Sequence, residues 1–195
     1  MEDIWGISHD QKLITMRILK EHSAGLIIDI QERLLPHICH HDQLEINTEV
    51  LIKGLKLLDI PILATEQYRK GLGLTVPSIR IALGDEKFIE KMSFSCCDDP
   101  GFEVELNKTG KTNIIIAGIE THVCVLQTVV DLVGLGFQPV VVEDCVSSRK
   151  ESDKNNAINR MRQEGAIITS YESILFELAR ISGTAAFKAI SSLVK

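Results

Sequence analysis

Short apolar runs alternate with amphipathic stretches along most of this chain. The apolar runs, rich in Ile, Leu and Val, predict buried strands at 24–30, 61–65, 88–91, 113–117, 139–143 and 166–169. Between them, apolar residues at helical spacing predict helices at 44–58, 101–107, 124–135, 154–164 and 171–181. Strand and helix alternate about six times, which requires a parallel sheet covered on both faces. The predicted fold class is therefore α/β, and such sheets carry their chemistry on the loops that follow the strands.

The chain is long enough for one well-buried domain. It has 195 residues, of which 45% are hydrophobic and 25% charged, an ordinary globular mixture. We expect a single domain over 1–195, in which 1–18 form an N-terminal extension of unknown role. The net charge is -6 and Lys and Arg do not cluster, so we expect no nucleic-acid partner.

The N-terminus does not resemble a targeting signal. Residues 1–4 are acidic where a signal or transit peptide would be basic, and no apolar run approaches the roughly 20 residues of a membrane span. Five cysteines without a C-x-x-C pair do not indicate a disulfide framework and fit a reducing compartment. We therefore expect a soluble, cytoplasmic protein that does not contact a membrane.

Three polar residues follow or close predicted strands. Cys124 lies where strand 113–117 gives way to a helix, whose first turn would favour a thiolate over a thiol. Asp29 and Lys91 close two other strands, and in a doubly wound sheet these ends meet at a central crevice. A carboxylate can take the thiol proton while an ammonium stabilises both anions. Taken singly, Cys124 could be a packing residue, Asp29 a cap, and Lys91 a surface side chain.

Candidates for a substrate pocket fall near the same strand ends. Glu66 and Gln67 follow strand 61–65 and could bind a polar group of a substrate, or equally brace the adjoining loop. That loop, 68–74, is predicted to be a lid or pocket wall, or a plain surface loop. The full set of pocket candidates is Gln31, Glu66, Gln67, Tyr68 and Phe94.

Five stretches together resemble the isochorismatase-like cysteine hydrolases. They are LIIDIQE (26–32), TEQY (65–68), KMSFS (91–95), AGIETHVCV (117–125) and VEDCVSSR (142–149), in family order between about Leu19 and Ala179. The resemblance implies a three-layer αβα sandwich with a six-stranded parallel sheet, Rossmann-like, in a homo-oligomer. It implies a catalytic triad at Asp29, Lys91 and Cys124. It also implies a cis peptide at Ile119–Glu120, which would aim the Glu120 and Cys124 amides into an oxyanion hole.

Departures from two branches of that family narrow the interpretation. True isochorismatases commonly have Gly in place of the cysteine, and nicotinamidases carry an Asp-x-His metal element between the triad Asp and Lys. Here that interval holds only the histidines of the 37–42 cluster, which lacks downstream partners, so we expect a solvated loop there. The resemblance is thus to the metal-free isochorismatase-domain-containing branch, with no metal and no cofactor. His122 is expected to be structural or pocket lining, and Asp144 to hold the 146–149 turn.

The sequence therefore predicts a cysteine hydrolase that cleaves C–N or related acyl bonds of a small-molecule substrate through a thioester. One alternative is a vinyl-ether hydrolase of the isochorismatase kind, in which Asp29 acts and Cys124 is incidental. The other is a binding protein that keeps the fold without turnover.

Overall fold

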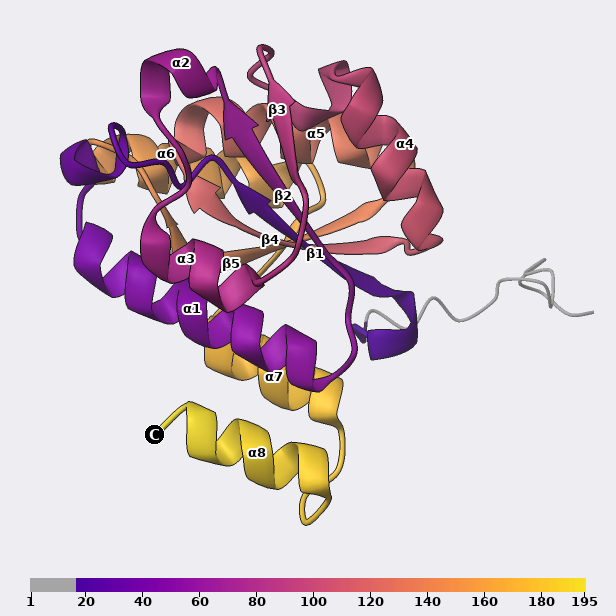
Figure 1. The fold of residues 1–195 in the computed structure, drawn as a ribbon. Coiled ribbons are helices and arrows are strands. Elements are labelled where there is room, and N and C mark those ends of the chain that lie inside the picture. Colours follow the sequence, from indigo (N-terminus) through magenta and orange to yellow (C-terminus); the bar gives the residue numbers. More distant parts are fainter. Residues whose placement is uncertain (1–16) are drawn as a thin grey trace, which may run out of the picture.

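Six parallel strands form the centre of the structure, a computed structural model that describes residues 17–195 (Figure 1). They are β1 (Ser23–Ile28), β2 (Ile62–Gln67), β3 (Phe88–Lys91), β4 (Asn113–Ile119), β5 (Gln138–Ser147) and β6 (Ile167–Thr169). Their order across the sheet is β3-β2-β1-β4-β5-β6. Each strand overlaps a predicted one, so the α/β fold class is confirmed. Most of the predicted N-terminal extension, residues 1–16, lies outside the described residues.

Helices cover both faces of this sheet, giving three layers (Figure 1). One face is covered by α1 (His41–Leu57), α3 (Pro77–Leu83) and α7 (Tyr171–Ala179), and α8 (Ala185–Leu193) packs on the outside of α1 and α7. The other packs against α4 (Pro100–Thr109), α5 (Leu126–Gly134) and α6 (Glu151–Gln163). Shorter turns are α2 (Arg69–Leu72), η1 (Lys20–His22), η2 (Leu35–His37), η3 (Cys96–Asp98) and the π-helical η4 (Thr121–Val125).

The central strands are apolar throughout because each strand contributes to two cores. In β1, Leu26 and Ile28 pack toward α4, α5 and α6, whereas Ile27 packs toward α1. All three are at most 1% exposed. Side chains of a strand alternate between the two faces, so a sheet covered on both sides needs a continuous apolar run rather than an alternating one. This requirement is why β1 and β4 were readable from the sequence.

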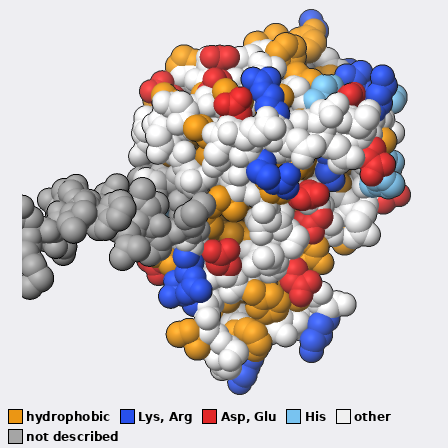
Figure 2. All heavy atoms as spheres, turned by 180° about the vertical axis from the view of Figure 1, so that it is seen from behind, with side chains coloured by type: hydrophobic (Ala, Val, Ile, Leu, Met, Phe, Trp, Pro, Cys, Tyr) orange, Lys and Arg blue, Asp and Glu red, His pale blue; other side chains and the backbone are white. Residues whose placement is uncertain are grey.

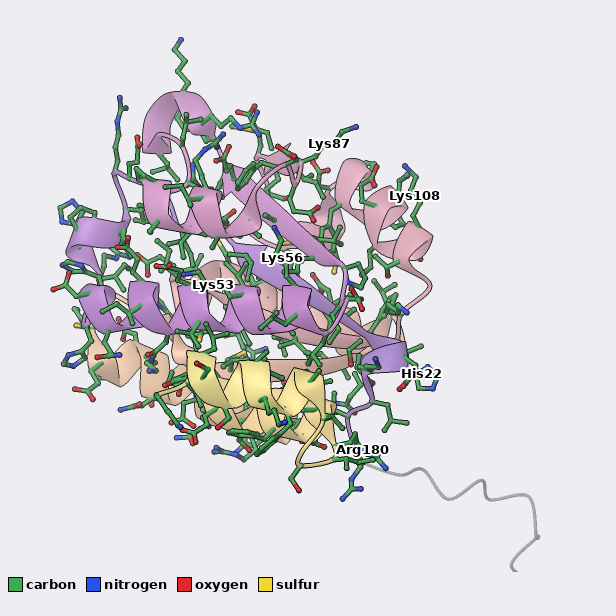
Figure 3. All side chains as sticks on the ribbon, turned by 60° about the horizontal axis from the view of Figure 1, so that its bottom comes forward. His22, Lys53, Lys56, Lys87, Lys108 and Arg180 are labelled. Carbon is green, nitrogen blue, oxygen red and sulfur yellow. The ribbon has the colours of Figure 1, made fainter. Side chains whose placement is uncertain are left out.

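Three helices were not predicted. Residues 68–74 were expected to be irregular, but α2 occupies Arg69–Leu72, and α3 and α8 were left unassigned. Helix α3 runs beside α1, and the Lys56 ammonium of α1 donates to the Leu83 carbonyl at the end of α3. Figure 3 shows Lys53 and Lys56 along α1. Helix α8 packs against α1 and α7, farther from the sheet than either (Figure 1).

The chain reverses its direction of travel across the sheet between β1 and β4. From β1 it proceeds outward to β2 and β3, then returns to β4 on the other side of β1 and continues to β5 and β6. Open α/β sheets bind ligands at such a switch point, outside the carboxyl ends of the strands. The place to look for a site is therefore where β1 and β4 end.

The face in Figure 2 carries Lys and Arg side chains interspersed with Asp and Glu rather than gathered by sign. None of the helices within residues 17–195 combines the length and the apolar character needed to cross a membrane.

Candidate active site

Three neighbouring strands end in a residue with left-handed backbone. Tyr68 follows β2 with φ 40°, Asp29 follows β1 with φ 54°, and Glu120 follows β4 with φ 53°. Residues other than glycine adopt this conformation uncommonly, and it is enriched where a function requires it. The strain is concentrated at the carboxyl edge of β2, β1 and β4, which includes the topological switch point.

Asp29 and Lys91 form a buried ion pair at this edge. The Lys91 Nζ lies 2.6 Å from Asp29 Oδ2, and both side chains are at most 1% exposed. Strand β2 lies between β3, which carries Lys91, and β1. The long lysine side chain reaches across β2 to the carboxylate. The ion pair therefore joins residues from two strands that are not adjacent in the sheet.

The Lys91 ammonium has no donor left for a substrate. Besides Asp29, it donates to the carbonyls of Ser93 and Phe94, each at 3.1 Å. An ammonium has three N–H groups, so all of them are used. Burial lowers the pKa of Lys91, but the negative charge of Asp29 more than offsets this and the pKa is raised. Lys91 is therefore a permanent cation that holds Asp29 in place.

Cys124 lies beside this pair in the π-helical turn η4, with 3% of its surface exposed. Burial raises the pKa of its thiol well above the usual range, and the charge of the nearby Asp29 raises it further, while Lys91 lowers it by less. The sequence-based expectation of a thiolate is therefore wrong for the folded site. Desolvation is the largest cause and the neighbouring Asp29 the next, so the resting Cys124 is a neutral thiol.

The expected cis peptide is also wrong. No peptide bond within residues 17–195 is cis, and the bond between Ile119 and Glu120 is trans. The left-handed backbone of Glu120 turns the chain out of β4 instead. Ile119 is fully buried in the core on the α1 side of the sheet. The Glu120 carboxylate is 8% exposed, pairs with Arg149 and lies 3.4 Å from His122 Nδ1.

Gln67 is the pocket candidate that lies closest to the thiol. Its Oε1 is 3.9 Å from Cys124 Sγ, and its Nε2 is within 3.4 Å of the Met92 and Ser93 carbonyls. Gln31, in contrast, is fully buried and committed to the backbone. Its amide group exchanges hydrogen bonds with the Gln67 N–H (2.8 Å) and carbonyl (3.0 Å) and donates to the Gly73 carbonyl (2.7 Å). Gln31 therefore fixes Gln67 rather than lining a pocket.

Glu66 lies on the opposite side of β2 from Gln67. Its fully buried carboxylate accepts from the Thr75 N–H (2.7 Å) and pairs with Arg69 and Arg80. Burial raises the pKa of Glu66, but the hydrogen bonds from Thr75 and Arg69 outweigh this and lower it. Of the two roles expected for Glu66, the structure places it in loop bracing, because consecutive strand residues point to opposite faces.

Tyr68 and Phe94 remain open to solvent beside the site. They are 44% and 53% exposed, and both are tied to Lys91 through the backbone: the Tyr68 N–H donates to the Lys91 carbonyl at 3.0 Å, and the Phe94 carbonyl accepts from the ammonium. Both side chains are thus exposed next to Lys91.

Two residues of the site were missed from the sequence. Thr65 donates from Oγ1 to Asp29 Oδ1 at 2.7 Å, and Cys96 lies next to Thr65 with its Sγ 3.9 Å from that hydroxyl. Burial raises the pKa of Cys96 to about 12. A signal for Thr65 was present, because it is two residues before Gln67 on β2 and therefore shares its face.

The remaining expectations concern residues at the rim. His122 Nδ1 lies 3.0 Å from Ser148 Oγ and its Nε2 lies 4.0 Å from Asp153, which fits the structural role expected for it. Asp144 does not hold the 146–149 turn. Its carboxylate accepts instead from the Tyr171 N–H at 2.9 Å, the first N–H of α7. All five cysteines are free thiols, and no group of three or more His, Cys, Asp or Glu within residues 17–195 is arranged to hold a metal ion.

Gly118 sets how closely β4 approaches β1 below the site. A Cβ at this position would lie 2.6 Å from the Ile28 carbonyl oxygen and 2.7 Å from Ile28 Cβ. We expect Gly118→Ala to lower the free energy of unfolding by about 1–3 kcal/mol, because backbone atoms of a central strand cannot move aside cheaply. Urea denaturation followed by circular dichroism measures this change.

The control for this variant is Gly134→Ala at the end of α5. A Cβ there meets nothing within 4 Å. Alanine has the higher helix propensity, so this variant should be as stable as the natural chain or slightly more stable. Equal stability of the two alanine variants would show that the close approach of β4 to β1 is not needed.

The chain resembles known proteins over nearly its whole length. Residues 23–173 match the model of the isochorismatase domain. The secreted isochorismatase effector Isc1 of Phytophthora sojae is 38% identical over 190 residues, covering 92% of this chain and 87% of that protein. The solved structure of the MAR1 ribonuclease from Caenorhabditis elegans is 38% identical with a TM-score of 0.86, covering 91% of this chain and 92% of that one.

Two bacterial YcaC structures share the fold at lower identity. The octameric hydrolase YcaC of Escherichia coli is 27% identical and covers 91% of this chain and 90% of its own. YcaC of Pseudomonas aeruginosa, solved with hexane-2,5-diol and covalent acrylamide, is 26% identical and covers 92% of both chains. Both have a TM-score of 0.86. Since the domain model matches most of the chain and a relative shares 38% of its residues over almost its full length, this protein belongs to the isochorismatase domain family.

Proposed function

We propose that this protein is a cysteine hydrolase that transfers the acyl group of a small amide-like or acyl substrate to Cys124. The observation that carries the proposal is the buried ion pair of Asp29 and Lys91 next to a neutral buried thiol. A charged carboxylate beside a thiol is a proton acceptor in place, and Lys91 keeps it charged.

In the first half-reaction, Asp29 takes the thiol proton as the Cys124 sulfur attacks the substrate carbonyl carbon. The C–S bond forms and the carbonyl oxygen becomes an oxyanion. When that oxygen returns its electrons, the C–N bond breaks and the nitrogen leaves with the proton from Asp29. The product left on the protein is a thioester of Cys124.

In the second half-reaction, water replaces the amine. Asp29 takes a proton from the water as its oxygen adds to the thioester carbonyl, and the C–S bond then breaks. The leaving sulfur recovers the proton from Asp29, which restores the thiol and the carboxylate. The Cys124 amide is our candidate donor to the oxyanion, because the first N–H groups of a helix have no partners within it.

The substrate would be small and partly apolar. Gln67 places an amide oxygen 3.9 Å from the sulfur, and Tyr68 and Phe94, whose backbone groups bind Lys91, are exposed aromatic residues. We further propose a cytoplasmic protein that binds neither membrane nor nucleic acid and that forms a homo-oligomer. The free cysteines and the net charge of -6 support the first part, and the octameric relative supports the second.

The covalent acrylamide in Pseudomonas aeruginosa YcaC also supports the proposal. Acrylamide is an electrophile of the kind that thiolates attack, so a relative of this fold carries a nucleophile.

The test is acylation by p-nitrophenyl acetate, followed by a panel of small amides. We expect a burst of p-nitrophenolate, one acetyl group on the peptide that contains Cys124, and loss of both in Cys124→Ala. An acetyl group found on another residue while Cys124 stays free would refute the proposal.

A second candidate is the vinyl-ether hydrolysis that gives the family its name, favoured by the 38% identity to an isochorismatase effector. That chemistry would need Asp29 and would survive the loss of the thiol. Isochorismate belongs in the same panel, and turnover by Cys124→Ala but not by Asp29→Asn would favour this candidate.

A further inference from the structure

Thr65 forms hydrogen bonds with Asp29. It lies on β2, the strand between β1, which Asp29 follows, and β3, which carries Lys91. In the sheet, Thr65 of β2 pairs with Ile28 of β1, the residue before Asp29. The Asp29 N–H donates to the Thr65 carbonyl at 3.3 Å, and the Thr65 hydroxyl donates to Asp29 Oδ1 at 2.7 Å. Both side chains are 1% exposed. The two residues therefore bind each other twice, once through the backbone and once through the side chains.

The direction of the side-chain hydrogen bond follows from chemistry. A carboxylate only accepts, so the hydrogen of the Thr65 hydroxyl must point at Asp29. On its other side, this hydroxyl faces the Cys96 sulfur at 3.9 Å, and Cys96 is a neutral thiol that can donate weakly. The Thr65 hydroxyl thus accepts weakly from the Cys96 thiol and donates to the Asp29 carboxylate.

The two carboxylate oxygens of Asp29 accept hydrogen bonds from different donors. Oδ2 accepts from Lys91 at 2.6 Å and Oδ1 accepts from Thr65 at 2.7 Å. One donor on one oxygen leaves the carboxylate free to rotate about its Cβ–Cγ bond, whereas a donor on each oxygen fixes its plane. Each oxygen can accept a second hydrogen bond, so the fixed carboxylate keeps room for the thiol proton.

We propose that Thr65 is a positioning residue that fixes the plane of the Asp29 carboxylate and stabilises its charged form, an inference that rests on the proposed function. In this role Thr65 acts through Asp29 rather than on the reacting atoms. Its loss should slow proton transfer from Cys124 without changing the binding of substrate.

The experiment measures acylation by p-nitrophenyl acetate in the first turnover, as a function of pH and of reagent concentration. Thr65→Val removes the hydroxyl at nearly constant volume, and Thr65→Ser keeps it. Thr48→Val is the matched control, because Thr48 is a fully buried threonine of α1 that lies outside the site. Cys124→Ala supplies the blank.

We expect Thr65→Val to lower the maximal acylation rate by a factor of about 10–100, the range associated with one hydrogen bond to a charged group. The half-saturating concentration should stay within about threefold, a change too small to account for lost binding. The acid limb of the rate should move to higher pH, because the charged carboxylate has lost a donor. Thr65→Ser should keep most of the rate and the position of the limb, and Thr48→Val should match the natural protein.

The proposal is overturned if Thr65→Val keeps both the rate and the acid limb, or if Thr65→Ser is as impaired as Thr65→Val. If Thr65→Val fails to fold, Thr65→Ala compared with Thr65→Ser gives the same decision, because those two side chains differ by one oxygen. A different result would show that the proposed function itself is wrong. In that case Asp29→Asn or Cys124→Ala would be acylated as fast as the natural protein.

Discussion

Asp29→Asn is expected to lower acyl transfer by about 10²–10⁴-fold, the usual contribution of a general base, while making Cys124 react faster with iodoacetamide at neutral pH. Acyl transfer should slow while labelling accelerates, because Asp29 acts on the Cys124 thiol in two ways. It accepts the proton during the reaction, but its charge raises the pKa of Cys124 at rest. Removing the charge leaves Lys91 as the dominant neighbour, so the pKa should fall and the thiolate fraction should rise. Labelling rates across pH, read by mass spectrometry, measure this.

The matched control is Asp59→Asn. Asp59 also has left-handed backbone, with φ 57°, but it follows α1 and is far from the site in the fold. Asparagine adopts this conformation readily, so neither substitution strains the backbone. Asp59→Asn should change neither acylation nor labelling. If Asp29→Asn instead slowed acylation and labelling together, the electrostatic account of the resting thiol would be incorrect.

The fold could be predicted from the sequence because its strongest signals are local. Runs such as Ile114–Ala117 are apolar on both faces, and only a sheet covered by helices on both sides can bury them. Of the missed helices, α2 and α3 have only 4 and 7 residues, too few to show a periodic pattern, whereas α8 has 9. Pro77 opens α3 and Gly84 closes it, and the Thr184 side chain caps α8 by accepting from the Phe187 N–H.

The candidate site was only partly predictable, because its geometry depends on contacts across the sheet. The strand ends indicated Asp29, Lys91 and Cys124, but not that Lys91 would reach across β2, nor that Thr65 would donate to Asp29. Alternation along β2 could have separated Glu66 from Gln67, since only one of the two can face the sulfur. Nothing in the sequence shows that the Gln31 side chain binds backbone.

The failed expectation of a thiolate shows which effect dominates in this site. A helix terminus carries only a partial charge with which to stabilise a thiolate, whereas desolvation destabilises the full charge of that thiolate. Cys124 is 3% exposed and has Asp29 beside it, and both conditions favour the neutral thiol. The sequence gives the helix terminus directly, but burial becomes visible only once the chain is folded.

The largest change in stability is expected for Lys91→Met, which shortens the unbranched side chain by one atom and removes the charge. It leaves Asp29, 1% exposed, without its ionic partner, and breaking a buried pair in this way typically costs about 3–5 kcal/mol in the free energy of unfolding. Urea denaturation at neutral pH measures the loss. Lys53→Met is the control, because Lys53 pairs with Glu49 on the surface of α1 at 48% exposure, where removing the charge should cost at most about 0.5 kcal/mol.

The double variant Asp29→Asn/Lys91→Met separates the cost of an unpaired charge from the value of the pair itself. With both charges gone, neither partner is buried alone, so the double variant should be more stable than Lys91→Met. It should nevertheless be as inactive as Asp29→Asn, because the proton acceptor is missing. If the two substitutions instead destabilised the protein additively, Asp29 and Lys91 would not act as a pair, and Lys91 could not be what keeps the base charged beside Cys124.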